Sequence, residues 1–527
     1  MTSARTLARA GLIVSGAFLV SRVLGWLRLV VIADAVPAPA ELDAFFAAFR
    51  IPDLLFQLVA AGALSSALIP VIAGLLETDG EQRAWRVVST IANLMLAALL
   101  VLAVLVLVFA DRLVPIYTSG FGPATMAQTI DLTRIMVLSP IFLALGALAT
   151  SVLNARGRFA ASAIAPIVYN LAIIGAALLL APSFGVVGLA VGVVLGSLGH
   201  LLVQIRPLQA IGFRYERRID AGDPAARKAL TLMAPRAVGL GASQITFVVV
   251  TALATTVGVG GVTAFTIAFT LLQIPIGVIG VPLGVVLFPS MSRGAASGDR
   301  DEFIGLLTRS IRLLAVVMVP VGVLAAVVRL EAVAILFGQL DPKTIRSAAD
   351  TFLGFLPGLP AHALIAVLAR AFYARQDTLT PVVVAVGAVL VNTTLAVLLV
   401  GPLGLPGVAI AIAIAAWLEA TTLTLLLRRR EGPLGLAAIT DVALRVLVAS
   451  AIAGAIAIFV HLLVGPVLAP DPATLGRPGI PGLAAVILIV TAAFASAFWV
   501  LAFALRIDDA RTMVAIMVDA IRRPRRT

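Results

Sequence analysis

The chain has 527 residues, of which 61% are hydrophobic and only 12% charged, and its mean hydropathy is +1.12. Soluble proteins carry about 25% charged residues, so this composition excludes a soluble globular protein and predicts an all-α integral membrane protein. The net charge of +12 does not indicate nucleic-acid binding, because the basic residues are dispersed in short segments between apolar stretches. With no cysteine and only three histidines far apart in sequence, we expect no enzyme activity, no cofactor and no metal site.

Apolar stretches long enough to cross a bilayer, which takes about 20 residues, recur along the whole chain. We predict about fourteen transmembrane helices. They lie near residues 11–35, 44–76, 87–110, 131–153, 160–181, 185–205, 229–256, 261–288, 309–337, 351–373, 379–400, 404–427, 440–465 and 480–505. Arg22 and Arg28 interrupt the first stretch, so we interpret it as an uncleaved span and not as a signal peptide.

The basic residues fall unevenly on the two sides of these spans. If the N-terminus is cytoplasmic, most of the 38 lysines and arginines lie in the inner segments and few lie in the outer ones. Cytoplasmic loops carry such an excess in membrane proteins. We therefore predict a multi-pass protein with both termini in the cytoplasm.

Short motifs recur at a nearly constant spacing and indicate a duplication. Ala44-Phe45-x-x-Ala48-Phe49 recurs as Ala264-Phe265-x-x-Ala268-Phe269, Leu68-x-Pro70 as Leu287-x-Pro289, Ala155-Arg156 as Ala374-Arg375, and Gly185-x-x-Gly188 as Gly404-x-x-Gly407. Six spans return the chain to the same side, so the two copies run parallel, an arrangement found in transporters with a substrate site between the repeats. We predict a six-helix half over 1–205, a basic cytoplasmic linker over 206–228, and a second half over 229–430. Two additional helices and a basic tail occupy 431–527.

The segment from Ser21 to Pro70 places ionisable side chains inside predicted spans. Arg22, Arg28 and Arg50 lie there with Asp53. A charge at the centre of a membrane helix costs about 2.5–3.5 kcal/mol and by default indicates function. With a helix rise of about 1.5 Å per residue, Arg28 and Arg50 lie at similar depth. Guanidiniums facing a wet cavity suit a phosphate or pyrophosphate; alternatively, Asp53 neutralises Arg50 on the same helix face and the arginines only hold helices together.

Three further residues of this region and its repeat carry predictions. Asp43 opens the second predicted span and either contacts substrate or caps that helix. Pro52 removes a hydrogen bond inside the second span and should bend it. Pro275 lies in the corresponding eighth span, and we predict that this pair of bent spans acts as gates or hinges.

Comparison of the two halves extends the predicted substrate site. Arg50 corresponds to Thr270, and the pair Ser21-Arg22 corresponds to Ser243-Gln244. The first half thus has charges where the second has neutral hydrogen-bonding groups. We expect Ser21, Gln244 and Thr270 to contribute to the site, with an anionic ligand held mainly by the first half.

The charged segment belongs to a longer motif with a family resemblance. The motif comprises Ser21-Arg22-Val23-Leu24-Gly25, Asp43-Ala44-Phe45-Phe46-x-Ala48-Phe49-Arg50-Ile51-Pro52 and Gly62-Ala63-Leu64-Ser65, and later Leu153-Asn154-x-Arg156-x-Arg158-Phe159 and Phe372-Tyr373-x-Arg375-Gln376-Asp377-x-x-Thr380-Pro381. This set resembles the MurJ/MviN lipid II flippases of the multidrug/oligosaccharidyl-lipid/polysaccharide (MOP) exporter superfamily. The resemblance extends over the whole chain.

The resemblance implies a function in peptidoglycan biosynthesis. It implies that the chain moves an undecaprenyl-pyrophosphate-linked glycan, lipid II, from the inner to the outer leaflet of the bacterial plasma membrane by alternating access. Arg22, Arg28 and Arg50 would lie near the pyrophosphate, Asp43 would be a functional acid, and the last two spans would hold the lipid tail. Membrane lipids, a coupling ion and cell-wall synthesis proteins are the implied partners.

The sequence also departs from the family pattern. An acid usual after the position of Arg28 is Leu29 here, and a basic pair followed by an acid in the second span is replaced by Phe56-Gln57 and Ala61. An arginine usual in the eighth span is replaced by Thr270. The alternatives are an exporter of another lipid-linked glycan or amphiphile, and a non-transporting scaffold in cell-wall synthesis.

Overall fold

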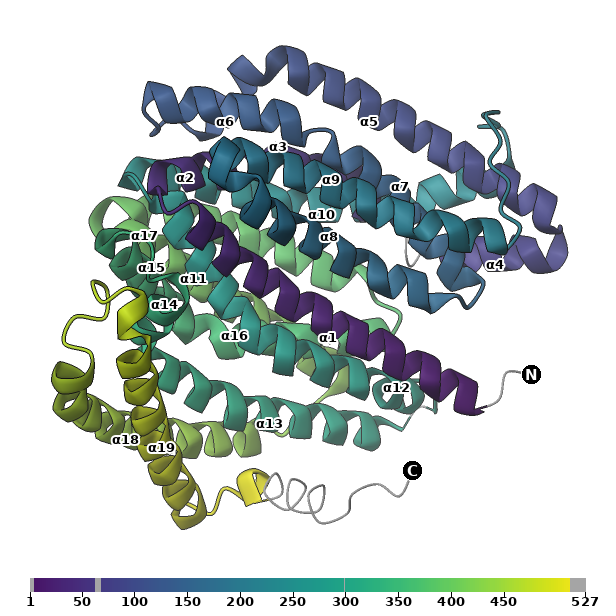
Figure 1. The fold of residues 1–527 in the computed structure, drawn as a ribbon. Coiled ribbons are helices and arrows are strands. Elements are labelled where there is room, and N and C mark those ends of the chain that lie inside the picture. The colour runs from purple at the N-terminus through teal and green to yellow at the C-terminus, as the bar shows by residue number, and fades with distance from the viewer. Residues whose placement is uncertain (1–3, 62–67, 298, 512–527) are drawn as a thin grey trace. The chain divides into compact units, whose positions relative to one another are not determined.

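The chain is almost entirely helical, as Figure 1 shows. The computed structural model describes residues 4–61, 68–297 and 299–511, and no β-strand occurs among them. The chain divides into two compact units, Met1–Thr263 and Ala264–Thr527. The prediction of an all-α protein is confirmed, whereas the predicted motif residues Gly62, Ala63, Leu64 and Ser65 lie outside the described residues.

The first unit contains most of the predicted site residues. Its helices are α1 (Ala4–Ala35), α2 (Pro39–Ala48), α3 (Arg50–Phe56), the π-helix η1 (Gln57–Ala61), α4 (Ile69–Thr78), α5 (Glu81–Tyr117), α6 (Pro123–Met136), α7 (Ser139–Ala155), α8 (Phe159–Leu179), α9 (Ala181–Ala210) and α10 (Pro224–Val257), followed by the start of α11 (Gly261–Pro275). Helix α8 packs against both α1 and α9, and α3 packs against α7 and α10. Helix α7 also packs against α8 and thus links the α1–α8 pair to the α3–α10 pair.

The second unit contains the repeat of this arrangement and the additional helices. Its elements are the π-helix η3 (Ile276–Gly280), α12 (Val281–Ser297), α13 (Arg300–Val327), α14 (Arg329–Phe337), α15 (Pro342–Phe355), η4 (Leu356–Gly358), α16 (Leu359–Ala374), α17 (Leu379–Glu431), α18 (Leu436–Leu468), η5 (Arg477–Gly479) and α19 (Ile480–Ala504). Helices α18 and α19 pack against each other, and α13 packs against both α16 and α18. The additional pair is thus attached to the second repeat through α13.

Eleven helices within the described residues are long and apolar enough to cross a membrane. One of them, α17, contains two predicted spans, 379–400 and 404–427, and bends between them at Gly404. The second predicted span, 44–76, is divided into the short elements α2, α3, η1 and α4, so it does not appear among the eleven. A multi-spanning helical protein is confirmed, and the count of fourteen stays a prediction.

The backbone repeats unusual conformations at the spacing found in the sequence. The π-helix Gln57–Ala61 recurs as Ile276–Gly280. Gly185 has φ 55° and ψ −139°, and its counterpart Gly404 has φ 62° and ψ −145°. A π-helix is rare and such glycine conformations are close to forbidden for other residues. Their recurrence at one common spacing supports two copies of one six-helix fold.

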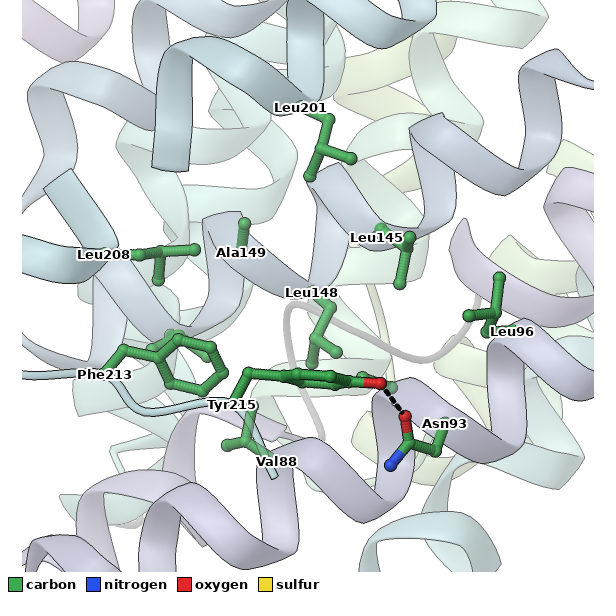
Figure 2. Close-up of a pocket in the computed structure, with 12 residues that line it drawn as sticks. Val88, Asn93, Leu96, Leu145, Leu148, Ala149, Leu201, Leu208, Phe213 and Tyr215 are labelled. Carbon is green, nitrogen blue, oxygen red and sulfur yellow. Dashed lines mark hydrogen bonds between the residues drawn. The ribbon is translucent and has the colours of Figure 1, made fainter. Parts of the chain in front are cut away.

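Residues 211–223, within the predicted linker, form a strap that lies along α5. Asn93 Nδ2 donates to the carbonyl oxygens of Glu216 at 3.0 Å and Arg218 at 3.3 Å, and Ser89 Oγ accepts from the Glu216 amide at 3.0 Å. Figure 2 shows the Tyr215 hydroxyl meeting Asn93 beside an apolar cavity of about 230 Å³ between α5, α7 and α9. The strap is therefore a fixed part of the first unit.

Candidate functional site

Arg28, Arg50 and Asp53 form a charged cluster in the first unit. Asp53 lies within electrostatic range of Arg50 and Arg28, but no ion-pair contact joins these described side chains. Arg28 comes from α1 and the other two from α3, so two elements meet at this carboxylate. The predicted pairing of Asp53 with Arg50 stays a prediction, and the proximity of Arg28 is an addition that helix periodicity did not predict. Two guanidiniums thus lie near one carboxylate, so these three side chains together carry one excess positive charge.

Neighbouring helices hold each of these arginines in place. Arg50 Nε donates to Thr251 Oγ1 at 2.7 Å, and its guanidinium carbon lies 5.6 Å from the ring centre of Phe247 on α10. The Arg28 guanidinium carbon lies 5.6 Å from the ring centre of Tyr169 on α8. Aromatic faces attract cations, and more strongly where the cation is desolvated. The cluster is thus built from α1, α3, α8 and α10.

The contacts recorded for Arg22 do not include any residue of this cluster. Its guanidinium carbon is 5.0 Å from the ring centre of Phe18, one turn earlier on the same helix. The side chain of Phe18 is half exposed, and no described acid forms an ion pair with Arg22. The structure therefore places Arg28 and Arg50 within electrostatic range of Asp53, whereas Arg22 has no recorded interaction with it.

Asp43 is buried and caps a helix other than its own. It is 1% exposed, and its carboxylate accepts from Gly260 N at 2.7 Å, Thr263 N at 2.8 Å and Thr263 Oγ1 at 2.7 Å. These donors belong to the start of α11, whose unsatisfied amides favour a carboxylate. The N-cap residue of α2 is Ala38, so the alternative that Asp43 caps its own helix is wrong. Asp43 and Thr263 are counterparts in the repeat, 220 residues apart.

The three neutral residues predicted for the site have different surroundings. The backbone oxygen of Ser21 accepts from Asn170 Nδ2 at 3.3 Å, and the Thr270 hydroxyl donates to its own helix, to Thr266 O at 2.7 Å. The Gln244 side chain lies half-buried on α10. Ser21 and Gln244 belong to the first unit and Thr270 to the second. Their predicted contacts with substrate stay predictions.

The two prolines predicted as hinges lie at helix interruptions. Pro52 has no N–H to donate to the carbonyl of Ala48, the last residue of α2, and α3 begins between them. Pro275 is the last residue of α11, directly before the π-helix η3. A missing donor explains each interruption. Their predicted role in gating stays a prediction.

The residues that contact Arg28 and Arg50 were not identified from the sequence. Tyr169, Phe247 and Thr251 lie far along the chain from the charges they contact. Of these three residues, only Tyr169 could have been singled out from the sequence, because tyrosine is scarce in this chain, with four residues in 527. Threonine and phenylalanine are common in apolar helices, so Thr251 and Phe247 do not stand out in the sequence.

Comparison with known proteins reveals a match over most of the chain. The family model described as "Lipid II flippase MurJ" matches residues 32–468. The lipid II flippase MurJ of Burkholderia cenocepacia is 33% identical over 436 residues, covering 80% of this chain and 84% of that protein. The probable lipid II flippase MurJ of Rhizobium tropici is 31% identical over 501 residues, covering 93% of each.

Solved structures show the same fold. A lipid II flippase MurJ in an inward closed conformation superimposes with a TM-score of 0.72 at 21% identity, covering 92% of this chain and 98% of that one. An inward-facing multidrug resistance MATE transporter of the MOP superfamily gives a TM-score of 0.66 at 17% identity, covering 78% and 95%. The chain therefore has the fold that these two transporter structures share.

Proposed function

The chain belongs to the lipid II flippase MurJ family, and on that premise we propose that it moves lipid II across a bacterial plasma membrane for cell-wall synthesis. The movement runs from the inner to the outer leaflet by alternating access. Both termini lie in the cytoplasm in this proposal, because the basic residues concentrate on that side. The partners are the undecaprenyl-pyrophosphate-linked glycan and the surrounding membrane lipids.

The observation that carries the proposal is the placement of Arg28 and Arg50 within electrostatic range of a single acid, Asp53, with Arg50 held by Thr251. Two guanidiniums in an apolar span are costly unless an anion compensates them, and one carboxylate compensates only part of their charge. A pyrophosphate carries more negative charge and more acceptor oxygens than a carboxylate. We infer that the pyrophosphate binds both arginines when the substrate enters, and that the nearby Asp53 compensates part of their charge when the site is empty.

This exchange gives each charged residue a role. Arg28 and Arg50 bind the pyrophosphate oxygens bidentately, while Thr251 orients Arg50 through its hydroxyl. Arg22, which lies against Phe18, is free to turn toward a second phosphate. Asp53 keeps the empty site from carrying two uncompensated cations.

The energy for transport comes from an ion gradient or from the membrane potential in this proposal. The sequence contains no Gly-rich loop ending in Gly-Lys-Ser or Gly-Lys-Thr, the motif with which many ATPases hold nucleotide phosphates. A coupling ion and cell-wall synthesis proteins complete the expected partners.

The test is rescue of cells depleted of their own lipid II flippase, combined with a leaflet-resolved assay of labelled lipid II in vesicles. The wild-type chain should rescue growth, and Arg28→Ala/Arg50→Ala should abolish both rescue and flipping at unchanged protein level. Asp53→Asn should bind lipid II at least as tightly but release it more slowly. Full rescue by the double alanine variant would refute the role of the cluster.

A second candidate is export of another lipid-linked glycan or amphiphile. Leu29, Phe56 and Gln57 stand where the family usually has charged residues, which favours a substrate that makes fewer polar contacts. Competition by a panel of undecaprenyl-pyrophosphate glycans against labelled lipid II separates the two candidates. A protein that binds none of them would instead favour a scaffold role.

A further inference from the structure

A basic cavity of about 570 Å³ lies where the α7–α8 connection meets the end of α9. Arg158 and Arg206 line it together with the first residues of α8, 159–161. Both arginine side chains are exposed, and neither forms an ion pair or hydrogen bond with any residue that the structure describes. The cavity therefore presents two uncompensated positive charges.

The start of α8 adds amide donors to this cavity. The helix begins at Phe159, its N-cap residue is Arg158, and no described side chain accepts a hydrogen bond there. The first amides of a helix lack partners within the helix, and a cation at this end is unfavourable with respect to the helix dipole. An arginine is thus an unsuitable N-cap for a helix unless an anion lies beside it.

The second repeat shows which group occupies this position in the other copy. By the spacing that relates Ala155-Arg156 to Ala374-Arg375, the counterpart of Arg158 is Asp377. The Asp377 carboxylate accepts from Thr380 N at 2.9 Å and from Thr380 Oγ1 at 2.6 Å, and it pairs with Arg430. One copy therefore carries its own anion between a helix N-terminus and an arginine. The first copy keeps the helix N-terminus and supplies two arginines, but no described carboxylate pairs with them.

The surroundings indicate what kind of molecule brings the missing anion. Within two turns of the cavity, Ile164 on α8 is 44% exposed, and Leu202 and Ile205 on α9 are 52% and 36% exposed. Both helices are long and apolar enough to span a membrane. The cavity thus lies where an apolar helix surface ends and basic residues begin, as expected for the headgroup region of a bilayer.

We propose that Arg158, Arg206 and the first turn of α8 bind the phosphodiester of an anionic phospholipid. The guanidiniums contact the phosphate oxygens, the amides of α8 donate to them, and the acyl chains follow the exposed side chains of α8 and α9. The lipid phosphate fills the place that the carboxylate of Asp377 fills in the second repeat. This site is separate from the Arg28–Asp53–Arg50 cluster and does not depend on transport.

The test is lipid binding to the purified full-length protein, measured by native mass spectrometry during titration with phosphatidylglycerol or phosphatidylcholine. Arg158→Gln/Arg206→Gln should weaken phosphatidylglycerol binding about 30-fold, from the usual contribution of two basic residues at a membrane surface. Arg214→Gln/Arg217→Gln removes two exposed arginines from the strap and is the matched control, which should leave binding unchanged. Equal losses in both variants, or no loss in the first, would overturn the proposal.

Two further arms identify the ligand and guard against misfolding. Inorganic phosphate at millimolar concentration should not displace the lipid; displacement at equal affinity would mean that the site takes free phosphate instead. Arg158→Asp gives the first repeat the acid of the second and supplies an N-cap to α8, so it should fold at least as stably as the wild type. It should lose phosphatidylglycerol, and retention of the lipid in this variant would also overturn the proposal.

Discussion

Replacing Asp43 with alanine removes the carboxylate that holds the start of α11. The carboxylate accepts from Gly260 N, Thr263 N and Thr263 Oγ1, and the residue is 1% exposed. Water has no access to replace it there, so both amides lose their acceptor. The threonine hydroxyl can rotate to another acceptor, whereas the amides cannot.

The size of the effect follows from these two amides. An unsatisfied buried donor costs about 1–3 kcal/mol, so opening of the first turn of α11 should become easier by about 3 kcal/mol in total. This corresponds to an increase of about 100-fold in the opening equilibrium. Asp43→Asn retains one acceptor oxygen and should produce an increase between those of the wild type and the alanine variant.

Hydrogen exchange measured by mass spectrometry reads this opening directly, because exchange reports local opening free energies. Peptides that contain Gly260 and Thr263 should exchange about 100-fold faster in Asp43→Ala, while peptides from α8 should not change. Glu41→Gln is the matched control, since it removes an acid from the same helix that makes no described hydrogen bond. Unchanged exchange at Gly260 and Thr263 in Asp43→Ala would refute the capping role.

Other variants test the bends, the loops and the strap. Gly404→Ala should destabilise the protein by about 1–3 kcal/mol, because its φ of 62° and ψ of −145° disfavour any side chain; thermal melting against Gly401→Ala, whose added methyl meets open space, measures this. Hydrogen bonds from the hydroxyl and amide of Thr380 lower the pKa of Asp377 from 3.8 to about 2, so this stabilisation is complete above about pH 4 and is lost as the pH falls toward 2. Melting curves of Asp377→Asn should lack that acid-dependent component. Asn93→Ala removes three hydrogen bonds to the strap and should speed its limited proteolysis.

The repeated parts of the fold could be predicted from the sequence because duplication leaves traces at fixed spacing. Their spacing alone pairs Gly185 with Gly404, and the two residues share an unusual backbone conformation. The division of the second span could be predicted only in part. Pro52 predicts a bend, but no residue pattern predicts a π-helix. One extra residue in a helical turn leaves the amino-acid composition of the segment unchanged.

The candidate site was predictable only where its charges share a helix. Asp53 lies three residues after Arg50, so helix geometry predicted that pair. Arg28 comes near the same carboxylate from α1, and Asp43 reaches the start of α11 from a distant part of the chain. Contacts of this kind depend on how helices pack. In apolar helices, packing is set by small residues, and these residues are too common in the sequence to reveal which helices meet.

The paired π-helices have a consequence for movement. In each of η1 and η3, a backbone hydrogen bond spans one residue more than it would in an α-helix. If the π-helical turn shifts along the helix, each side chain that it passes rotates by about 100° about the helix axis. This is the angle of one residue at roughly 3.6 residues per turn. A single carbonyl changes partner at each step, and the helix never unwinds. In that case, each half would turn a helix surface from one neighbour to another by rotation alone.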